Sequence, residues 1–162
     1  MQEGDNGERR IKNVLYAGVI GGLIAIFHFA ILFQLSYFEF FAISFAVVMS
    51  DTFASEIGVL DKKVFMITTF SRTTRGINGG ISLLGEFAAF IGSFLIGLSY
   101  VILKLGNMSI FSPILIIIMG FIGCQIDSVL GALFENKGKL SKGQVNLLSI
   151  IITIFISFPF IY

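Results

Sequence analysis

Four acidic residues lie inside stretches of sequence that are otherwise strongly apolar, and they are the first candidates for chemistry. Asp51 and Glu56 lie toward the end of one apolar stretch, Glu86 lies near the start of the next, and Asp127 lies toward the end of a later one. A charge inside a membrane span costs at least about 2.5–3.5 kcal/mol, so acids at such positions call for a functional explanation. We therefore treat them as candidates for binding a metal or a substrate.

The ligand type indicates which metal these acids would bind. Carboxylates and the hydroxyl groups near them are hard oxygen donors, which suit Mg²⁺ bound together with a phosphate substrate. The chain has one cysteine and one histidine, too few for a typical zinc site of nitrogen and sulfur ligands. Asp51 and Asp127 come from different predicted helices at similar depth, so they could converge on one Mg²⁺. The alternative is that these acids pair with Arg72, Arg75 or helix hydroxyls and only hold helices together.

A basic, glycine-rich segment precedes the stretch that contains Glu86. Glycines allow positive backbone angles, so successive amides can curl around an anion, and the helix start that follows adds free N–H groups. Arginines add forked donors for phosphate oxygens. The segment is thus a candidate phosphate site, the alternative being a turn whose arginines only set topology. It reads Ser71-Arg72-Thr73-Thr74-Arg75-Gly76-Ile77-Asn78-Gly79-Gly80-Ile81-Ser82.

Long apolar stretches must position these residues. Hydrophobic residues make up 56% of the 162 residues and charged residues only 13%, where soluble domains have roughly a quarter charged. These proportions exclude a soluble globular domain and a disordered chain. A helix needs about 20 apolar residues to cross a bilayer. Five stretches reach that length, at residues 13–35, 37–59, 81–103, 112–134 and 144–162.

We therefore predict an all-α, polytopic transmembrane bundle of about five spans. Residues 1–12 form a polar leader, and residues 13–162 form a single transmembrane domain. The first stretch is longer than the 7–15 apolar residues of a secretory signal, so we read it as a retained helix. Small residues allow close helix contacts in lipid, and Gly18 and Gly22 have the spacing of a dimer motif. A homodimer is therefore possible, with packing inside one subunit as the alternative. Further small-residue faces are expected at Gly21, Gly92, Gly97, Gly120, Gly123 and Gly131.

The basic residues predict an orientation. With five spans, the leader and the loops at 60–80 and 135–143 share one side of the membrane. The only basic residue on the other side is then Lys104. Basic residues near span ends are retained in the cytoplasm, so the amino terminus is predicted inside and the carboxyl terminus outside. The acids and the candidate phosphate segment then face the cytoplasm. The shared side holds ten of the eleven basic residues: Arg9, Arg10, Lys12, Lys62, Lys63, Arg72, Arg75, Lys137, Lys139 and Lys142.

Four segments of the chain, taken in order, match one known pattern. They are residues 50–58, residues 76–82, the run from Gly120 through Asp127 to Ala132, and Gln144-Val145-Asn146. Together they resemble the integral membrane family that includes plant phytyl-phosphate kinase and transmembrane protein 19. The resemblance runs from about residue 10 to the end of the chain.

The resemblance implies a CTP-dependent kinase that converts a prenyl monophosphate, such as phytyl or geranylgeranyl phosphate, into the diphosphate. On this hypothesis Asp51 and Asp127 bind Mg²⁺, and Glu56 holds a second metal position or orients a basic residue. The role of Glu86 stays open. Nucleotide phosphates would be held by the amides of Asn78, Gly79 and Gly80 and by Arg72 and Arg75, with further hydrogen bonds from Ser55, Ser82, Ser128 and Asn146.

Two other kinds of function share these features. Acids, magnesium and a phosphate loop also serve cytidylyl transfer from CTP to a lipid phosphate, which releases pyrophosphate. Acids inside the membrane and helix breaks also mark transporters. Against a transporter, the acids gather near one surface and no inverted repeat is visible. The nucleotide product separates the first two reactions.

Overall fold

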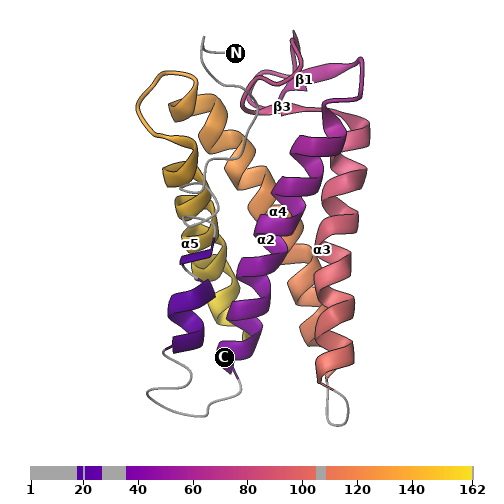
Figure 1. Cartoon of the computed structure of the whole chain (residues 1–162), viewed down its shortest axis with the longest axis vertical. Helices are drawn as coiled ribbons and strands as arrows, with labels where there is room; N and C mark the ends of the chain where they lie inside the picture. The colour runs from indigo at the N-terminus through magenta and orange to yellow at the C-terminus, as the bar shows by residue number, and fades with distance from the viewer. Residues whose placement is uncertain (1–17, 20, 27–35, 105–108, 162) are drawn as a thin grey trace.

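The computed structural model describes residues 18–19, 21–26, 36–104 and 109–161. Four helices in this part of the chain are long and apolar enough to cross a membrane, and successive helices run in opposite directions (Figure 1). A π-helix, η1 (Gly131–Glu135), continues the third of them. With η1 counted as the end of the third, their bounds differ by at most two residues from the four later predicted spans. The four are α2 (Ser36–Gly58), α3 (Leu83–Leu103), α4 (Phe111–Leu130) and α5 (Lys142–Ile161).

The predicted first span, residues 13–35, falls largely outside the described residues, as does the leader at 1–12. The described residues 18–19 and 21–26 are helical. A Cβ built on Gly21 would lie 2.9 Å from the Phe45 ring of α2, so this helix packs against α2 there. No described atom lies within 4 Å of a Cβ built on Gly18 or Gly22. The described residues therefore do not show what these two glycines face, and the homodimer stays a prediction.

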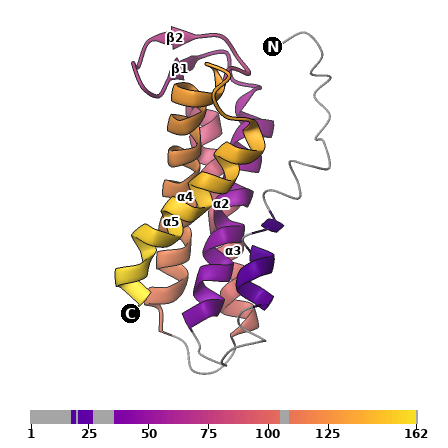
Figure 2. The same cartoon turned by 90° about the vertical axis from the view of Figure 1, so that its left-hand side faces the viewer.

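The segment between α2 and α3 forms a small antiparallel sheet instead of the predicted loop. Its strands β1 (Val64–Met66), β2 (Arg72–Thr73) and β3 (Gly80–Ile81) have the order β2-β1-β3. β1 supplies the β-branched and aromatic side chains that favour a strand, and Phe65 pairs with Arg72 on one side and Ile81 on the other. The sheet lies across the helix ends in both views (Figures 1 and 2). We call this end of the bundle the sheet end. It comprises the sheet, η1 and the first residue of α5.

Glycines bring the helices into close contact, as predicted. A Cβ on Gly92 of α3 would lie 2.7 Å from the Met49 carbonyl oxygen of α2. A Cβ on Gly120 of α4 would lie 2.6 Å from the Ala46 Cβ. In lipid, close approach of this kind replaces the hydrophobic drive that holds soluble bundles together. Predicted small-residue faces on α3 and α4 are therefore helix contacts inside one subunit.

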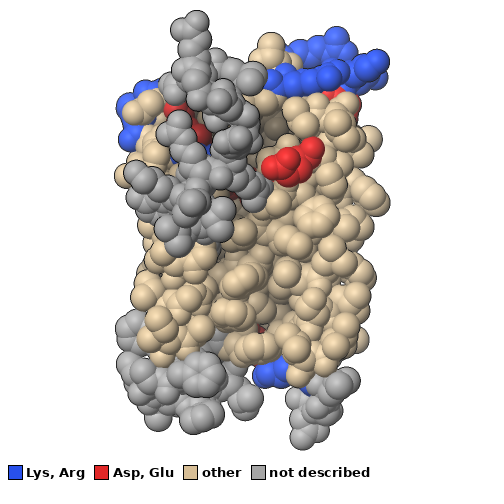
Figure 3. Space-filling model, in the orientation of Figure 1, with Lys and Arg blue, Asp and Glu red and all other residues tan. Residues whose placement is uncertain are grey.

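The two ends of the bundle differ in charge. Basic side chains gather at the sheet end, and little positive charge appears at the opposite end (Figure 3). At that opposite end Lys104 Nζ lies 3.6 Å from Glu39 Oε1, which also accepts a hydrogen bond from the Tyr100 hydroxyl. The pair ties the end of α3 to the start of α2. For the basic residues that the structure describes, the predicted separation of charge is thus reproduced; Arg9, Arg10 and Lys12 lie outside the described residues. Which end faces the cytoplasm stays a prediction.

Candidate functional site

Asp127 is the centre of a buried polar cluster at the sheet end. Its side chain is on the last turn of α4 and only 7% exposed. The Ser149 hydroxyl of α5 donates to Asp127 Oδ2 at 3.0 Å. In the amide orientation that satisfies its neighbours, Asn146 donates to the same oxygen at 3.2 Å. A buried carboxylate needs such donors because each oxygen left without one costs desolvation energy.

Asp51 lies across from Asp127 on the neighbouring helix α2. Both helices run toward the sheet end, and a Cβ on Gly123 would lie 2.3 Å from Val47 Cγ2. Asp51 and Asp127 each follow this contact by one helical turn. Among the charged groups acting on Asp127, Asp51 has the largest influence, followed by Lys142 with the opposite sign. The structure therefore brings together the two aspartates that the sequence placed on different helices.

The Asn78–Gly79 turn packs against the end of α4 and against η1, next to the cluster. Gly80 N donates to the Ile77 carbonyl oxygen at 3.0 Å, and Gly79 has a φ of 78°, as in a type II turn. A Cβ on Gly79 would lie 2.7 Å from the Ser128 carbonyl oxygen of α4. Asn136, just after η1, donates to the Asn78 carbonyl oxygen at 2.9 Å. The predicted phosphate segment is thus seated directly on the residue that follows Asp127.

Other predicted site residues lie at the surface of the sheet end. Arg72 and Arg75 are exposed on β2 and in the turn that follows it, and Glu56 is exposed on the last turns of α2. Ser55 is exposed too, and its hydroxyl donates to the Thr52 carbonyl oxygen of its own helix at 3.1 Å. No described hydrogen bond joins Ser55, Arg72 or Arg75 to Asp127. Their predicted roles require a ligand that extends from the cluster to the surface.

The start of α3 differs from the predicted anion site. Ser82 Oγ accepts a hydrogen bond from Gly85 N at 3.1 Å, as an N-cap does, and donates to the Gly58 carbonyl oxygen at 3.3 Å. Asp61 Oδ2 accepts from Leu84 N at 3.4 Å. The prediction of free N–H groups is therefore wrong for Leu84 and Gly85, which already bond to oxygens of the chain. A role for Ser82 in binding phosphate stays a prediction.

Asp61→Asn is expected to lower thermal stability at neutral pH. Hydrogen bonds from the backbone N–H groups of Lys63 and Leu84 hold the pKa of Asp61 below its usual value of 3.8. A carboxylate with a lowered folded pKa adds stability above its unfolded pKa and loses it as the pH falls through the folded pKa. The difference in Tm between wild type and variant should therefore be full at about pH 6 and shrink below about pH 4. Scanning fluorimetry in detergent measures it, and a gap that widens in acid contradicts the assignment.

Glu86 and Cys124 lie on the α3 side of the cluster. Gln125 of α4 donates to Glu86 Oε2 at 2.8 Å, and Glu86 is half-buried. The charges of Asp51, Asp127 and Glu86 all act on the buried Cys124, so the three acids lie within electrostatic range of it. Across the described ranges, however, no three histidine, cysteine, aspartate or glutamate side chains are grouped closely enough to hold a metal ion together. Protein ligands from this part of the chain would number at most two carboxylates.

Sequence reasoning missed three polar partners in this region. Ser149 and Gln125 each bond an acid inside the membrane span, and Asn136 bonds the Asn78–Gly79 turn. Ser149 carries a usable signal, because it follows Asn146 by three residues and so shares its helix face. Gln125 and Asn136 find their partners only through tertiary contacts, with separations of 39 and 58 residues along the chain.

Comparison with known proteins places the chain in a family. The model of the Integral membrane protein DUF92 family matches residues 1–154. The uncharacterized membrane protein MJ0933 of Methanocaldococcus jannaschii is 38% identical over 154 residues, which cover 89% of this chain and 59% of MJ0933. Protein VTE6, chloroplastic, of Arabidopsis thaliana is 30% identical over 158 residues, covering 92% of this chain and 46% of VTE6.

A second Arabidopsis thaliana protein, Protein PGR, is 35% identical over 104 residues, which cover 58% of this chain and 36% of PGR. The chain thus spans less than two thirds of the length of these curated relatives. No solved structure matches it. Since the family model covers nearly the whole sequence, the chain belongs to the DUF92 family of integral membrane proteins.

Proposed function

We propose that this chain is a membrane-embedded kinase, or part of one, that transfers the γ-phosphoryl group of CTP to a prenyl monophosphate and forms the diphosphate. The observation that carries the proposal is the buried Asp127, which interacts electrostatically with Asp51 and directly precedes Ser128, the residue on which the Asn78–Gly79 turn rests. Membership of the DUF92 family supports it, because the motifs that indicated the family also resemble plant phytyl-phosphate kinase.

The position of the cluster suits a substrate with an apolar tail and a charged head. The cluster is near one end of helices long enough to cross a membrane, so a phosphate there can meet a water-soluble nucleotide. The prenyl tail stays among apolar side chains between or beside the helices. The exposed Arg72 and Arg75 at the same end add positive charge where the nucleotide phosphates would approach.

The donor set fits Mg²⁺. Asp51 and Asp127 offer hard carboxylate oxygens, and Mg²⁺ in phosphoryl-transfer sites is usually held by one or two carboxylates together with substrate phosphates. When bound, Mg²⁺ neutralises charge on the phosphate oxygens. Asp51 and Asp127 would hold it, and the exposed Glu56 is the predicted residue for a second position or for orienting a basic side chain.

The remaining residues position the reactants. Gly80 N already donates to the Ile77 carbonyl oxygen, so binding of nucleotide phosphate by backbone amides falls to Asn78 and Gly79. A lipid monophosphate has a second pKa of about 6 and is largely a dianion at neutral pH, so it can attack without a strong general base. Catalysis then depends on positioning and on neutralising charge, as in other phosphoryl transfers.

The direct test uses purified protein in detergent with labelled CTP, Mg²⁺ and either phytyl or geranylgeranyl monophosphate. The kinase reaction yields CDP and the prenyl diphosphate in equal amounts. Release of pyrophosphate with a CMP-linked lipid would instead identify a cytidylyltransferase. If neither product forms, while the same lipid phosphate crosses protein-containing vesicles without nucleotide turnover, the kinase proposal is wrong and a transporter is supported.

A further inference from the structure

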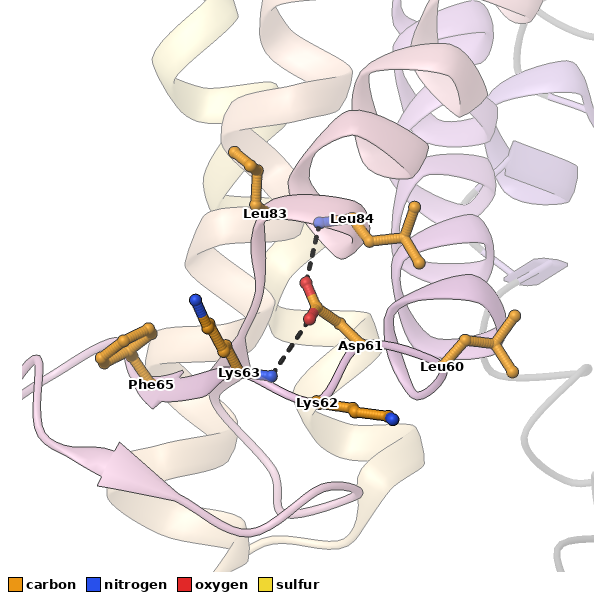
Figure 4. Close-up of a pocket in the computed structure, with 7 residues that line it drawn as sticks. All are labelled: Leu60, Asp61, Lys62, Lys63, Phe65, Leu83 and Leu84. Carbon is orange, nitrogen blue, oxygen red and sulfur yellow. Dashed lines mark hydrogen bonds between the residues drawn. The ribbon is translucent and has the colours of Figure 1, made fainter.

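A second feature of the sheet end lies away from the Asp127 cluster. An open cleft of about 590 Å³ forms where the end of α2, the loop after it and the start of α3 meet. Leu60 is 70% exposed and Leu83 is 86% exposed in its lining. Lys62 and Lys63 belong to the same lining (Figure 4). The cleft therefore combines large exposed apolar side chains with two positive charges.

The acidic residue in the cleft is already used by the fold. Asp61 Oδ1 accepts from Lys63 N at 3.0 Å and Oδ2 accepts from Leu84 N at 3.4 Å, as the dashed lines in Figure 4 show. These bonds anchor the loop on the start of α3 and so hold Lys62 and Lys63 beside it. In the described part of the chain neither ammonium group has a carboxylate within salt-bridge distance. The cleft keeps a net positive charge, which favours an anion.

An apolar stripe along α3 leads to this cleft. Leu83, Phe87, Phe90 and Phe94 are exposed by 86%, 64%, 46% and 42%, and their spacing of four, three and four residues puts them on one face of the helix. Because α3 is long and apolar enough to span the membrane, this face is expected to contact lipid. An acyl chain lying along the stripe would bring its headgroup to the lysines.

We propose that the cleft binds an anionic phospholipid of the leaflet at the sheet end. Lys63, whose side chain lies on the Leu83 side of the cleft, contacts the headgroup phosphate, and Lys62, which points to the other side of the loop, adds positive charge nearby (Figure 4). Leu83 and Phe87 contact the upper part of an acyl chain. Apolar side chains alone would accept any membrane lipid, so the two lysines give the preference for an anionic one. The site is independent of the proposed kinase reaction and does not use Asp51 or Asp127.

Native mass spectrometry of the full chain, released from micelles containing phosphatidylglycerol or phosphatidylcholine, tests this proposal. We expect wild-type protein to retain phosphatidylglycerol in preference to phosphatidylcholine. Each lysine near a membrane surface contributes about a fivefold change in affinity, so the Lys62→Ala/Lys63→Ala variant should bind phosphatidylglycerol about 25-fold more weakly. The matched control is Lys137→Ala/Lys139→Ala, which removes the same charge from exposed positions in the other loop at the sheet end and should bind as wild type does.

Other outcomes overturn the proposal. Equal losses of phosphatidylglycerol affinity in the two double variants would mean that only the overall charge of the sheet end determines binding. Competition by inorganic phosphate as effective as that by phosphatidylglycerol would mean that the cleft binds a free anion, not a lipid. A cleft variant that loses prenyl monophosphate binding while retaining phosphatidylglycerol would assign the cleft to the substrate. Circular dichroism and Tm of each variant confirm that it is folded.

Discussion

Asp127→Asn is expected to lower CTP turnover by a factor of about 10² to 10³ or more, which is typical for loss of one electrostatic group in an active site. Asparagine has nearly the shape of aspartate, but it lacks the charge that would hold Mg²⁺ and through it the phosphate oxygens. Initial rates of CDP formation measure the effect. Asp51→Asn should act in the same direction, because Asp51 is the charged group with the largest influence on Asp127.

The same variant should insert and fold. The asparagine Oδ1 can still accept from Ser149, which donates to Asp127 at 3.0 Å, and the variant removes one of the two acidic side chains from the apolar bundle. Its Tm in detergent should therefore not fall. Glu39→Gln serves as the control, since it removes a carboxylate at the opposite end of the bundle and should leave turnover unchanged. Near-normal turnover in both Asp51→Asn and Asp127→Asn would rule out the metal assignment.

Among alanine substitutions at the glycines of this segment, Gly79→Ala is expected to cause the largest loss of stability. The φ of Gly79 is 78°, where an alanine costs about 1–2 kcal/mol. Its Cβ would also lie 2.5 Å from the Ala132 Cβ and 2.7 Å from the Ser128 carbonyl oxygen, so the turn must lift from α4. Overpacking of this kind adds about 1–3 kcal/mol, for a total of about 2–5 kcal/mol. Turnover should fall as well, because the turn rests on Ser128, next to Asp127.

Gly76→Ala separates the backbone cost of a positive φ from the cost of the steric contacts of the added Cβ. Gly76 has a φ of 75°, close to that of Gly79, but no described atom lies within 4 Å of its added Cβ. It should therefore lose only the backbone cost of about 1–2 kcal/mol. Unfolding in detergent mixed with increasing amounts of SDS measures both variants. Equal losses in Gly76→Ala and Gly79→Ala would show that the contact with Ser128 and Ala132 contributes nothing.

Several features could be predicted from local sequence because the bilayer imposes them locally. Each span needs about 20 apolar residues whatever its neighbours are, so the four later spans appeared at nearly their observed bounds. The placement of ten basic residues on one side follows from counting alternate loops, and the structure gathers basic side chains at the sheet end. The motifs also identified the family, which the match over residues 1–154 confirms.

Other features depended on how the helices rotate and pair. Asp51 and Asp127 face each other because Gly123 lets α4 approach Val47 closely, and no periodicity in either helix states which partner its glycines meet. Glu56, only five residues after Asp51, is exposed because that step turns the helix by about 140°. The same rotation explains why Asp51 lies in the cluster and Glu56 does not.

The amino-acid sequence by itself determined that this protein is a membrane bundle with acids and basic loops at one end, because the cost of transferring each residue into lipid is a local property. Only the tertiary structure decided that the loop after α2 is a sheet, that its Asn78–Gly79 turn rests on Ser128, and that Asp61 occupies the start of α3. These contacts join residues far apart in the chain. They form because backbone N–H and C=O groups must find hydrogen-bonding partners wherever the packed helices place them.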